Sequence, residues 1–357
     1  MKSTLRNCFS ADGINTGRQD ELDIVKGLAI IFMIWCHVYR ELGADTTTFG
    51  GMMVDSILGG PFAAPMFMIC MGVGICYSRK STPNQFFKRG GLLILAGYGL
   101  NVARFVIPQI IVSLITGSKV FTEELLSNFM QVDILQFAGV AFILIGLAKK
   151  LMFPRYTLLI LAIIMSVAGV LLKDKGTGFL LADLILGLFW KTQSNAYFTL
   201  FHWFIFPVAG MFLGEWLLRC KDKKKMYQCL IPICLPIGFA AEGLALLVGI
   251  SLLDTFTGYF YMTLIDALFL ICLFISWSGL LYLFHEKFSN VSISLMQRMS
   301  RDINGIFCIH WVLLGILCAI RTLFMPELIP GFVPVTIVAI MVGIVSVLIA
   351  GKVRWRI

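Results

Sequence analysis

The sequence predicts an all-α polytopic membrane protein with about ten transmembrane helices. Hydrophobic residues make up 59% of the 357 residues and charged residues only 14%, against about 25% charged residues in a soluble domain. The apolar residues form blocks of roughly twenty, the length that crosses about 30 Å of hydrocarbon. Backbone groups in lipid must bond within their own segment, and the alternating pattern of a membrane β-barrel is absent. The blocks are therefore predicted to be helices.

The apolar blocks divide the chain into one membrane domain and two tails. The predicted spans are residues 22–42, 61–79, 90–115, 132–148, 156–172, 198–218, 228–252, 259–284, 303–325 and 331–350. Residues 1–21 are mostly polar and do not resemble a cleavable signal peptide. We expect them to form a cytoplasmic N-terminal tail, residues 22–350 to form a single transmembrane domain, and residues 351–357 to form a basic cytoplasmic tail.

The positions of the positive charges predict the orientation of these spans. Most of the 29 Lys and Arg residues fall in the segments that alternate with the outer loops, including the run at 221–225. Basic loops remain on the cytoplasmic side, so both termini are predicted to be cytoplasmic in a plasma-membrane protein. This placement explains the net charge of +9 without a nucleic-acid partner.

Two smaller features complete the predicted fold. The apolar stretch 177–190 is too short to span comfortably, and counting it as a span would place the basic run at 221–225 outside. We predict a short re-entrant or interfacial helix there, on the outer side. Most of the ten cysteines lie in apolar blocks and none lies in an outer loop, so no disulfide is expected.

The first span carries the most informative polar residues. Lys26 and His37 are separated by about 16 Å along a helix, so Lys26 is predicted near the inner surface and His37 in the outer half. Glu41 follows His37 by one turn and shares its face. A carboxylate there would orient the imidazole as a general base. The alternative for His37 is a hydrogen bond that packs one helix against another.

Several motifs in order resemble the transmembrane acyltransferases. They are Arg18 followed by Leu-Asp23-x-x-Lys26-Gly27-x-Ala-Ile and then His37; Pro61-Phe-Ala-Ala-Pro-Met-Phe67 to Gly72, with Phe86-Phe-Lys88-Arg89-Gly90 after it; Asp133-Ile-Leu-Gln136-Phe-Ala-Gly139; and Ser300-Arg301-Asp-Ile-Asn304 to His310-Trp311. They are similar to the acyltransferase 3 family and to the catalytic domain of heparan-alpha-glucosaminide N-acetyltransferase with its prokaryotic relatives. The likeness is strongest over residues 18–145.

The resemblance implies transfer of an acyl group, acetyl from cytoplasmic acetyl-CoA, to a hydroxyl or amine of an extracytoplasmic sugar or glycolipid. His37 would be the general base or a transient acyl carrier. One departure matters: the lysosomal enzyme has Asn at the position of His37 and its catalytic His in the next loop, but residues 42–60 contain no His. The role of His37 therefore follows only from members with His in the first helix. Lys26 also replaces the more usual Arg and loses its bidentate geometry.

The basic residues near the predicted inner mouth are candidates for binding the CoA phosphates. They are Arg18, Lys26, Lys88, Arg89 and Arg301, and the alternative for each is a topology signal only. Asn304 and His310, in the inner half of the ninth span, could line a CoA tunnel.

A second group of polar residues is predicted in the outer half. Asp133 and His202 would bind or orient the acceptor, with Asp133 also tuning His37. Arg104 would pair with Asp133 or stabilise the oxyanion; the alternative is a purely structural Arg104–Asp133 pair. Gln136 matches the family motif, although an interhelical hydrogen bond explains it equally well.

Two other function classes remain open at this point. Intramembrane His, Asp, Glu and Arg also suit a proton-coupled secondary transporter, although no inverted repeat is visible. A non-catalytic scaffold or lipid-binding module predicts no tunnel around His37. No zinc-type Cys–His spacing, P-loop or dinucleotide motif is present, so no metal is expected. The acceptor, the choice between O- and N-transfer, the acyl length and the oligomeric state are not specified.

Overall fold

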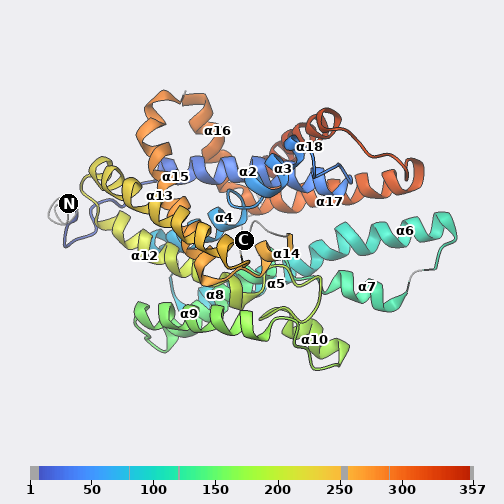
Figure 1. Cartoon of the computed structure of the whole chain (residues 1–357), viewed down its shortest axis with the longest axis horizontal. Helices are drawn as coiled ribbons and strands as arrows, with labels where there is room; N and C mark the ends of the chain where they lie inside the picture. Colours follow the sequence, from blue (N-terminus) through green and yellow to red (C-terminus); the bar gives the residue numbers. More distant parts are fainter. Residues whose placement is uncertain (1–7, 80, 120, 251–255, 289, 354–357) are drawn as a thin grey trace.

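The computed structural model describes residues 8–79, 81–119, 121–250, 256–288 and 290–353. Within these ranges the chain forms helices and no β-strand, with isolated bridges joining Phe9 to Cys220 and Val132 to Ala196. The long helices run mainly along the longest axis of the molecule (Figure 1). The predicted all-helical architecture is confirmed for these residues.

Each predicted apolar block is largely helical in the described residues, and residues 251 and 252 of the block 228–252 lie outside them. The long elements are α2 (Asp20–Glu41), α4 (Ala64–Tyr77), α5 (Pro83–Asn101), α6 (Ile107–Thr116), α8 (Ile134–Lys150), α9 (Arg155–Leu172), α12 (Ile205–Arg219), α13 (Lys223–Leu247), α15 (Leu264–Phe284), α17 (Ile303–Phe324) and α18 (Phe332–Val353). Eight helices in the described ranges are long and apolar enough to cross a membrane. The helices α4 and α8, with 14 and 17 residues, are shorter.

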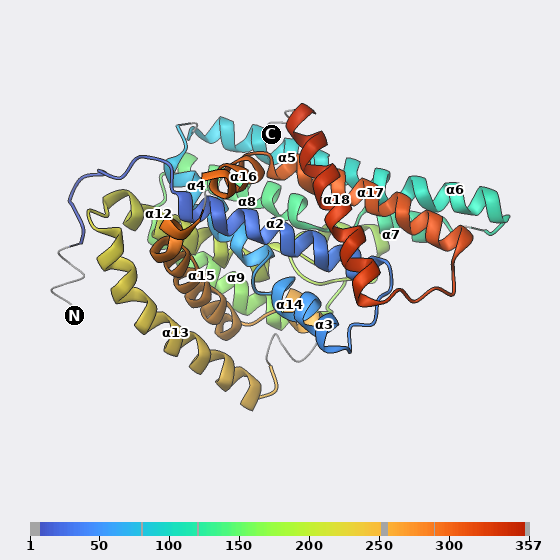
Figure 2. The same ribbon diagram turned by 90° about the horizontal axis from the view of Figure 1, so that it is seen from above.

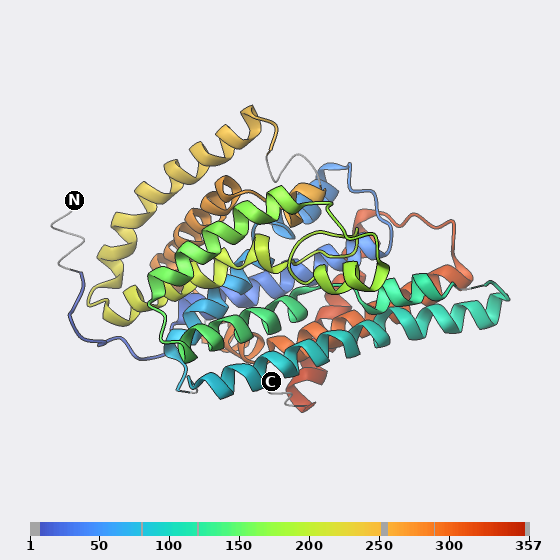
Figure 3. The same cartoon turned by 90° about the horizontal axis from the view of Figure 1, so that it is seen from below.

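Shorter elements connect these helices. They are α3 (Phe49–Met52), the π-helical η1 (Met53–Leu58) and η2 (Val102–Val106), α7 (Thr122–Phe129), α10 (Leu180–Leu186), α11 (Leu200–Trp203), α14 (Phe256–Phe260), the 3₁₀ turn η3 (His285–Lys287) and α16 (Asn290–Arg301). Segment η2 joins α5 to α6 in one continuous helix of 34 residues (Figure 3). Such a helix is about 50 Å long, more than the roughly 30 Å of a hydrocarbon core.

Side-chain caps define where several helices begin. Thr82 and Gln85 form a capping box at the start of α5, and Pro83 occupies the first turn, where its missing N–H is not needed. Asp222 accepts from the backbone N–H of Lys225 at the start of α13. This hydrogen bond to the charged form lowers the pKa of Asp222. The caps satisfy N–H groups that have no partner within the helix.

Glycines set the closest helix crossings. A methyl group on Gly139 of α8 would lie 2.6 Å from the carbonyl oxygen of Gly90 of α5. A methyl group on Gly72 of α4 would collide with the backbone of Pro207 in α12, and would lie 2.9 Å from Cα of Gly210. Small residues let membrane helices approach closely. These two crossings hold α4 and α8 in the interior of the bundle.

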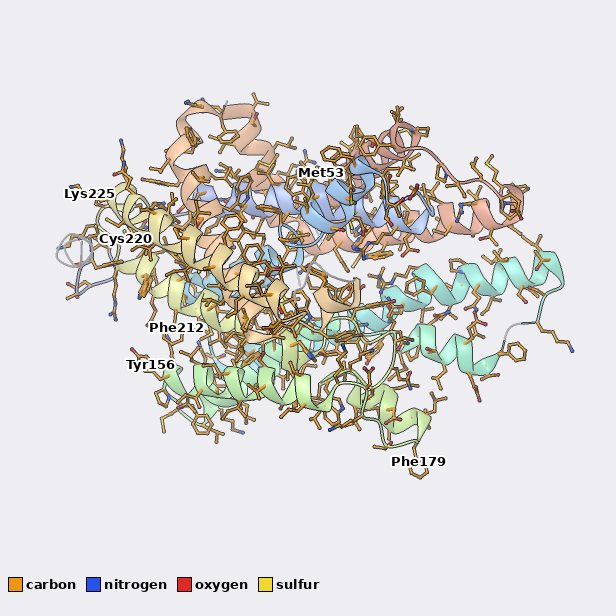
Figure 4. The ribbon with its side chains drawn as sticks, viewed as in Figure 1. Met53, Tyr156, Phe179, Phe212, Cys220 and Lys225 are labelled. Atoms are coloured by element: carbon orange, nitrogen blue, oxygen red, sulfur yellow. The ribbon has the colours of Figure 1, made fainter. Side chains whose placement is uncertain are left out.

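The short helix predicted at 177–190 is present as α10. Asp183 closes the preceding turn, because its carboxylate accepts from the backbone N–H of Thr177 at 2.6 Å and of Gly178 at 3.2 Å. Phe179 is 75% exposed and points away from the bundle (Figure 4). Lys225 lies at the opposite end of the long axis (Figure 4). An element of seven residues with an exposed apolar side chain fits an interfacial helix better than a span.

Candidate active site

Two neighbouring cavities lie between α2, α4, α8 and α17 and share part of their lining. The larger has a volume of about 690 Å³ and the smaller about 60 Å³. Four apolar side chains line both cavities: Met33, Phe67, Ile134 and Phe307. We call these four the neck, the larger space the large cavity and the smaller space the chamber.

The large cavity is cationic at one end. Lys26, Arg89 and Arg301 line it together with Ser78 and Asn304. These residues lie at the starts of α2, α5 and α17 and at the ends of α4 and α16. Helix α16 packs against α2 near this end (Figure 2). Of the predicted CoA-binding residues, Lys26, Arg89, Arg301 and Asn304 therefore share one cavity end, which we call the basic mouth.

Asp23 holds the start of α2 in place. Its buried carboxylate accepts from Arg18 and Ser300, and lies 3.2 Å from Nζ of Lys26. A methyl group on Gly27 would collide with Met296 of α16. The Leu-Asp-x-x-Lys-Gly motif thus anchors the basic mouth and allows α16 to pack closely. Arg18 also donates to a backbone oxygen of α16 at 3.0 Å. It lines neither cavity, although the sequence suggested that it would bind the CoA phosphates.

The chamber lies toward the C-terminal end of α2 and beside the N-terminal ends of α4 and α8. His37 and Arg40 of α2 line it, one and two turns beyond Met33 of the neck. Asp133 contributes from the N-terminus of α8, and Tyr259 from α14. Lys26, Met33, His37 and Arg40 are spaced by seven, four and three residues, so they follow one face of α2. One helix face therefore runs from the basic mouth to the chamber.

The imidazole of His37 pairs with a second imidazole. Its Nδ1 lies 2.9 Å from Nε2 of His310, and the rings stack with centroids 5.2 Å apart and an interplanar angle of 12°. His310 is fully buried and its Nδ1 lies 3.1 Å from the carbonyl oxygen of Ile306. His310 lines neither cavity, although the sequence suggested that it could line a CoA tunnel. Glu41, the partner predicted for His37, forms no hydrogen bond with it in the described structure.

Two ion pairs flank the chamber, and each involves a π-helical segment. Asp55 of η1 pairs with Arg40. Arg104 of η2 pairs with Asp133 through Nη2 and Oδ2 at 2.7 Å, and its side chain is fully buried. Single π-helical turns occur frequently at functional sites. Of the roles proposed for Arg104, the pair with Asp133 is the one that the structure contains.

The surroundings of Arg104 explain its burial. Its guanidinium lies 4.3 Å from the ring of Trp311 and 4.4 Å from that of Phe105. Nη2 also donates to Oδ1 of Asn101 at 2.9 Å. Trp311 in turn lies 4.4 Å, between ring centroids, from His37. Arg104 therefore supports the imidazole through Trp311 and does not line the chamber.

Two predicted acceptor residues have other partners. Gln136 forms a capping box with Asp133 and donates to the carbonyl of Gln131 at 3.1 Å. Both contacts are local to the start of α8, so they are not the interhelical hydrogen bond that the sequence suggested as the alternative. Nδ1 of His202 lies 2.8 Å from the hydroxyl of Thr199, and the His202 side chain is fully buried away from both cavities.

Sequence reasoning missed part of the chamber wall. Arg40 was not selected, although it follows His37 by three residues and shares its face. Phe198, Tyr259 and Phe260 also line the chamber, and no local sequence pattern marks them. Among the described residues, no group of three His, Cys, Asp or Glu side chains could hold a metal ion.

Comparisons with known proteins identify the family of the chain. No curated protein matches the chain. The family model of the heparan-alpha-glucosaminide N-acetyltransferase catalytic domain matches residues 18–238, more than half of the chain and most of both cavity walls. The chain therefore belongs to the heparan-alpha-glucosaminide N-acetyltransferase catalytic-domain family, a family of membrane acetyltransferases.

Proposed function

We propose that this protein transfers an acetyl group from cytoplasmic acetyl-CoA to a hydroxyl or amine of an extracytoplasmic sugar or glycolipid. One observation carries the proposal: the large cavity, with the basic mouth at one end, shares the neck residues with the chamber that His37 lines. The positive-inside bias supports an orientation with the basic mouth toward the cytoplasm and the chamber in the outer half of the membrane.

The large cavity suits the donor. Lys26, Arg89 and Arg301 would hold the phosphates of CoA through charge-assisted hydrogen bonds. A volume of about 690 Å³ lies within the range of roughly 300–1,000 Å³ for small-molecule sites. Apolar side chains of α4 and α8 line the interior and would contact the pantetheine arm. The arm would bring the thioester to the neck.

The chamber suits the transfer step. Nε2 of His37 would remove the proton from the acceptor O–H or N–H as the acceptor oxygen or nitrogen bonds to the thioester carbonyl carbon. The carbon–sulfur bond then breaks, and the CoA thiolate receives that proton from His37. Arg40, which lines the chamber, would stabilise the negative charge on the carbonyl oxygen. This assigns to Arg40 the oxyanion role first considered for Arg104.

The acceptor would enter from the outer end of the chamber. Phe198, Tyr259 and Phe260 present aromatic rings there, and Asp133 presents a carboxylate. Aromatic side chains combined with a few placed polar groups are typical of a site that orients a small ligand. The chamber of about 60 Å³ has room for only a few water-sized groups, which fits a short acyl group.

The test uses the full-length protein in lipid nanodiscs with labelled acetyl-CoA and two probes, glucosamine and N-acetylglucosamine. We expect acetyl transfer to at least one probe and a loss of about 10²–10⁴-fold in His37→Ala. His285→Ala is the matched control, because His285 lies in η3, lines neither cavity, and contacts the carbonyl and the ring of Tyr282. A His37→Ala protein that folds and keeps full activity would refute the role of His37.

Binding of the donor separates the enzyme from the transporter. Acetyl-CoA should raise the melting temperature of the protein, because a ligand that binds only the folded state stabilises it. Lys26→Ala should reduce that rise. A protein that acetyl-CoA does not stabilise, and that moves protons with an unrelated solute, would contradict the proposed function.

A further inference from the structure

We propose that His310 is a positioning residue: it fixes the proton of His37 on Nδ1 and thereby leaves Nε2 free to act as the base. The consequence for catalysis rests on the proposed function. The position of the proton does not depend on the proposed function, because it follows from the hydrogen bonds around the two imidazoles.

The hydrogen bond to Ile306 determines which ring nitrogen of His310 carries the hydrogen. Its Nδ1 lies 3.1 Å from the carbonyl oxygen of Ile306, one turn earlier in α17. A carbonyl oxygen only accepts hydrogen bonds, so Nδ1 of His310 must carry a hydrogen and donate it. A neutral imidazole has one N–H. Nε2 of a neutral His310 is therefore an acceptor.

The accepting nitrogen of His310 determines which nitrogen of His37 carries the hydrogen. Nδ1 of His37 lies 2.9 Å from Nε2 of His310. Because that nitrogen of His310 accepts, Nδ1 of His37 must donate, and its single hydrogen lies there. Nε2 of His37 then has a free lone pair. His310 lies outside the chamber while His37 lines it, so the Nε2 edge is the part of the ring that reaches the chamber.

The neutral state of His310 follows from its surroundings. The ring is fully buried, and no carboxylate of the described residues forms an ion pair with it. It contacts the ring of Phe307 edge-on and the ring of Trp311 at a tilt, and Trp311 also contacts the Arg104 guanidinium. A second cation beside Arg104 in an apolar environment would be costly. The doubly protonated form, in which both nitrogens donate, is therefore disfavoured.

The pair then acts in the manner of a base and its orienting group. In a serine-protease triad a carboxylate accepts from the base imidazole and fixes its tautomer; here Nε2 of His310 would do so. When Nε2 of His37 takes the proton of the acceptor, Nδ1 still donates to His310, which stabilises the imidazolium. The base need not rotate before it returns the proton to the CoA thiolate.

The tautomer is tested directly by ¹⁵N NMR of histidine-labelled protein in nanodiscs. The chain has four histidines, and His37→Ala identifies the signals of His37. We expect a protonated Nδ1 and an unprotonated Nε2 for His37 in the parent protein. In His310→Phe, which keeps a ring but offers no acceptor, this preference should disappear. A protonated Nε2 of His37 in the parent protein would overturn the inference, whether or not acetyl transfer is found.

Kinetics test the consequence. His310→Phe should lower kcat for acetyl transfer about 10²–10⁴-fold, the range of general-base catalysis. KM for acetyl-CoA should change less than about twofold, because His310 lines neither cavity. His310→Gln places an amide oxygen near the position of Nε2 and should recover a substantial part of kcat. If His310→Phe instead raises KM and leaves kcat unchanged, His310 contacts the donor and the inference is wrong.

Discussion

The buried pair between Arg104 and Asp133 allows a prediction of unequal costs. Arg104 has no exposed side-chain surface, whereas the buried Asp133 side chain is 10% exposed and lines the chamber. Asp133→Asn removes the charge but keeps a residue that caps α8, because Asn is as good an N-cap as Asp. Arg104→Met removes the guanidinium and keeps an unbranched side chain of similar reach.

The structure gives the magnitudes. Asp133→Asn leaves the guanidinium buried, with the Asn101 oxygen as its main acceptor. Leaving a buried charge without its partner costs about 3–5 kcal/mol, and we expect about 3 kcal/mol because the new amide oxygen still accepts. Arg104→Met leaves a carboxylate that faces the chamber and keeps the N–H of Ile134 at 2.7 Å. That loss should cost about 1–2 kcal/mol.

The assay is reversible unfolding in mixed micelles with increasing SDS, followed by circular dichroism. It compares the parent, both single variants and the double variant. In Arg104→Met/Asp133→Asn no charge remains without a partner, so the double variant should cost no more than about 2 kcal/mol. The coupling energy should then be at least about 2 kcal/mol.

Two results would refute this reasoning. One is an Arg104→Met cost larger than that of Asp133→Asn, which would mean that the carboxylate, not the guanidinium, suffers most from losing its partner. The other is additivity of the two single costs in the double variant. Either would show that the burial of Arg104 does not determine the energetics of the pair.

Three further predictions concern the passage and the fold. Phe307→Ala should widen the neck and raise kcat/KM for butyryl-CoA relative to acetyl-CoA about tenfold, and an unchanged ratio would argue against the neck as the acyl filter. Lys26→Ala should raise KM for acetyl-CoA about tenfold. Arg18→Ala, outside both cavities, should raise it much less, and equal effects would contradict binding of the donor at the basic mouth. Gly72→Ala should cost about 1–3 kcal/mol of unfolding free energy, while Gly74→Ala, with nothing within 4 Å of its added methyl, should not, and equal costs would contradict the helix crossing.

The fold could be predicted because the bilayer restricts it so strongly. Block length and backbone hydrogen bonding leave helices as the only choice, and the described part of each predicted block is largely helical. The elements that were missed lie outside this constraint. Helix α16 (Asn290–Arg301) is short and polar overall, with an apolar face that packs on α2. The π-helical η1 replaces what looked like a loop at 53–58.

The site was predicted in part for a related reason. Lys26 and His37 share a helix face that sequence spacing reveals, and both line the passage. Same-helix spacing also suggested Glu41 as the partner of His37, but the actual partner is His310, 273 residues away. No spacing rule reports a contact between distant helices. The inward direction of Arg104 depends on the π-helical η2, which shifts the helix face and leaves no sequence signal.

On the proposed function, the neck would let the donor reach the chamber without opening a path for ions. A donor that reaches His37 from the basic mouth must pass Met33, Phe67, Ile134 and Phe307. An apolar constriction of this kind blocks ions by excluding water. The charges beyond it are held in ion pairs, Arg40 with Asp55 and Arg104 with Asp133, so neither pair adds a net charge that would draw ions inward. On the proposed function, only the slender, uncharged thioester end of the donor fits between the cationic mouth and the histidine pair.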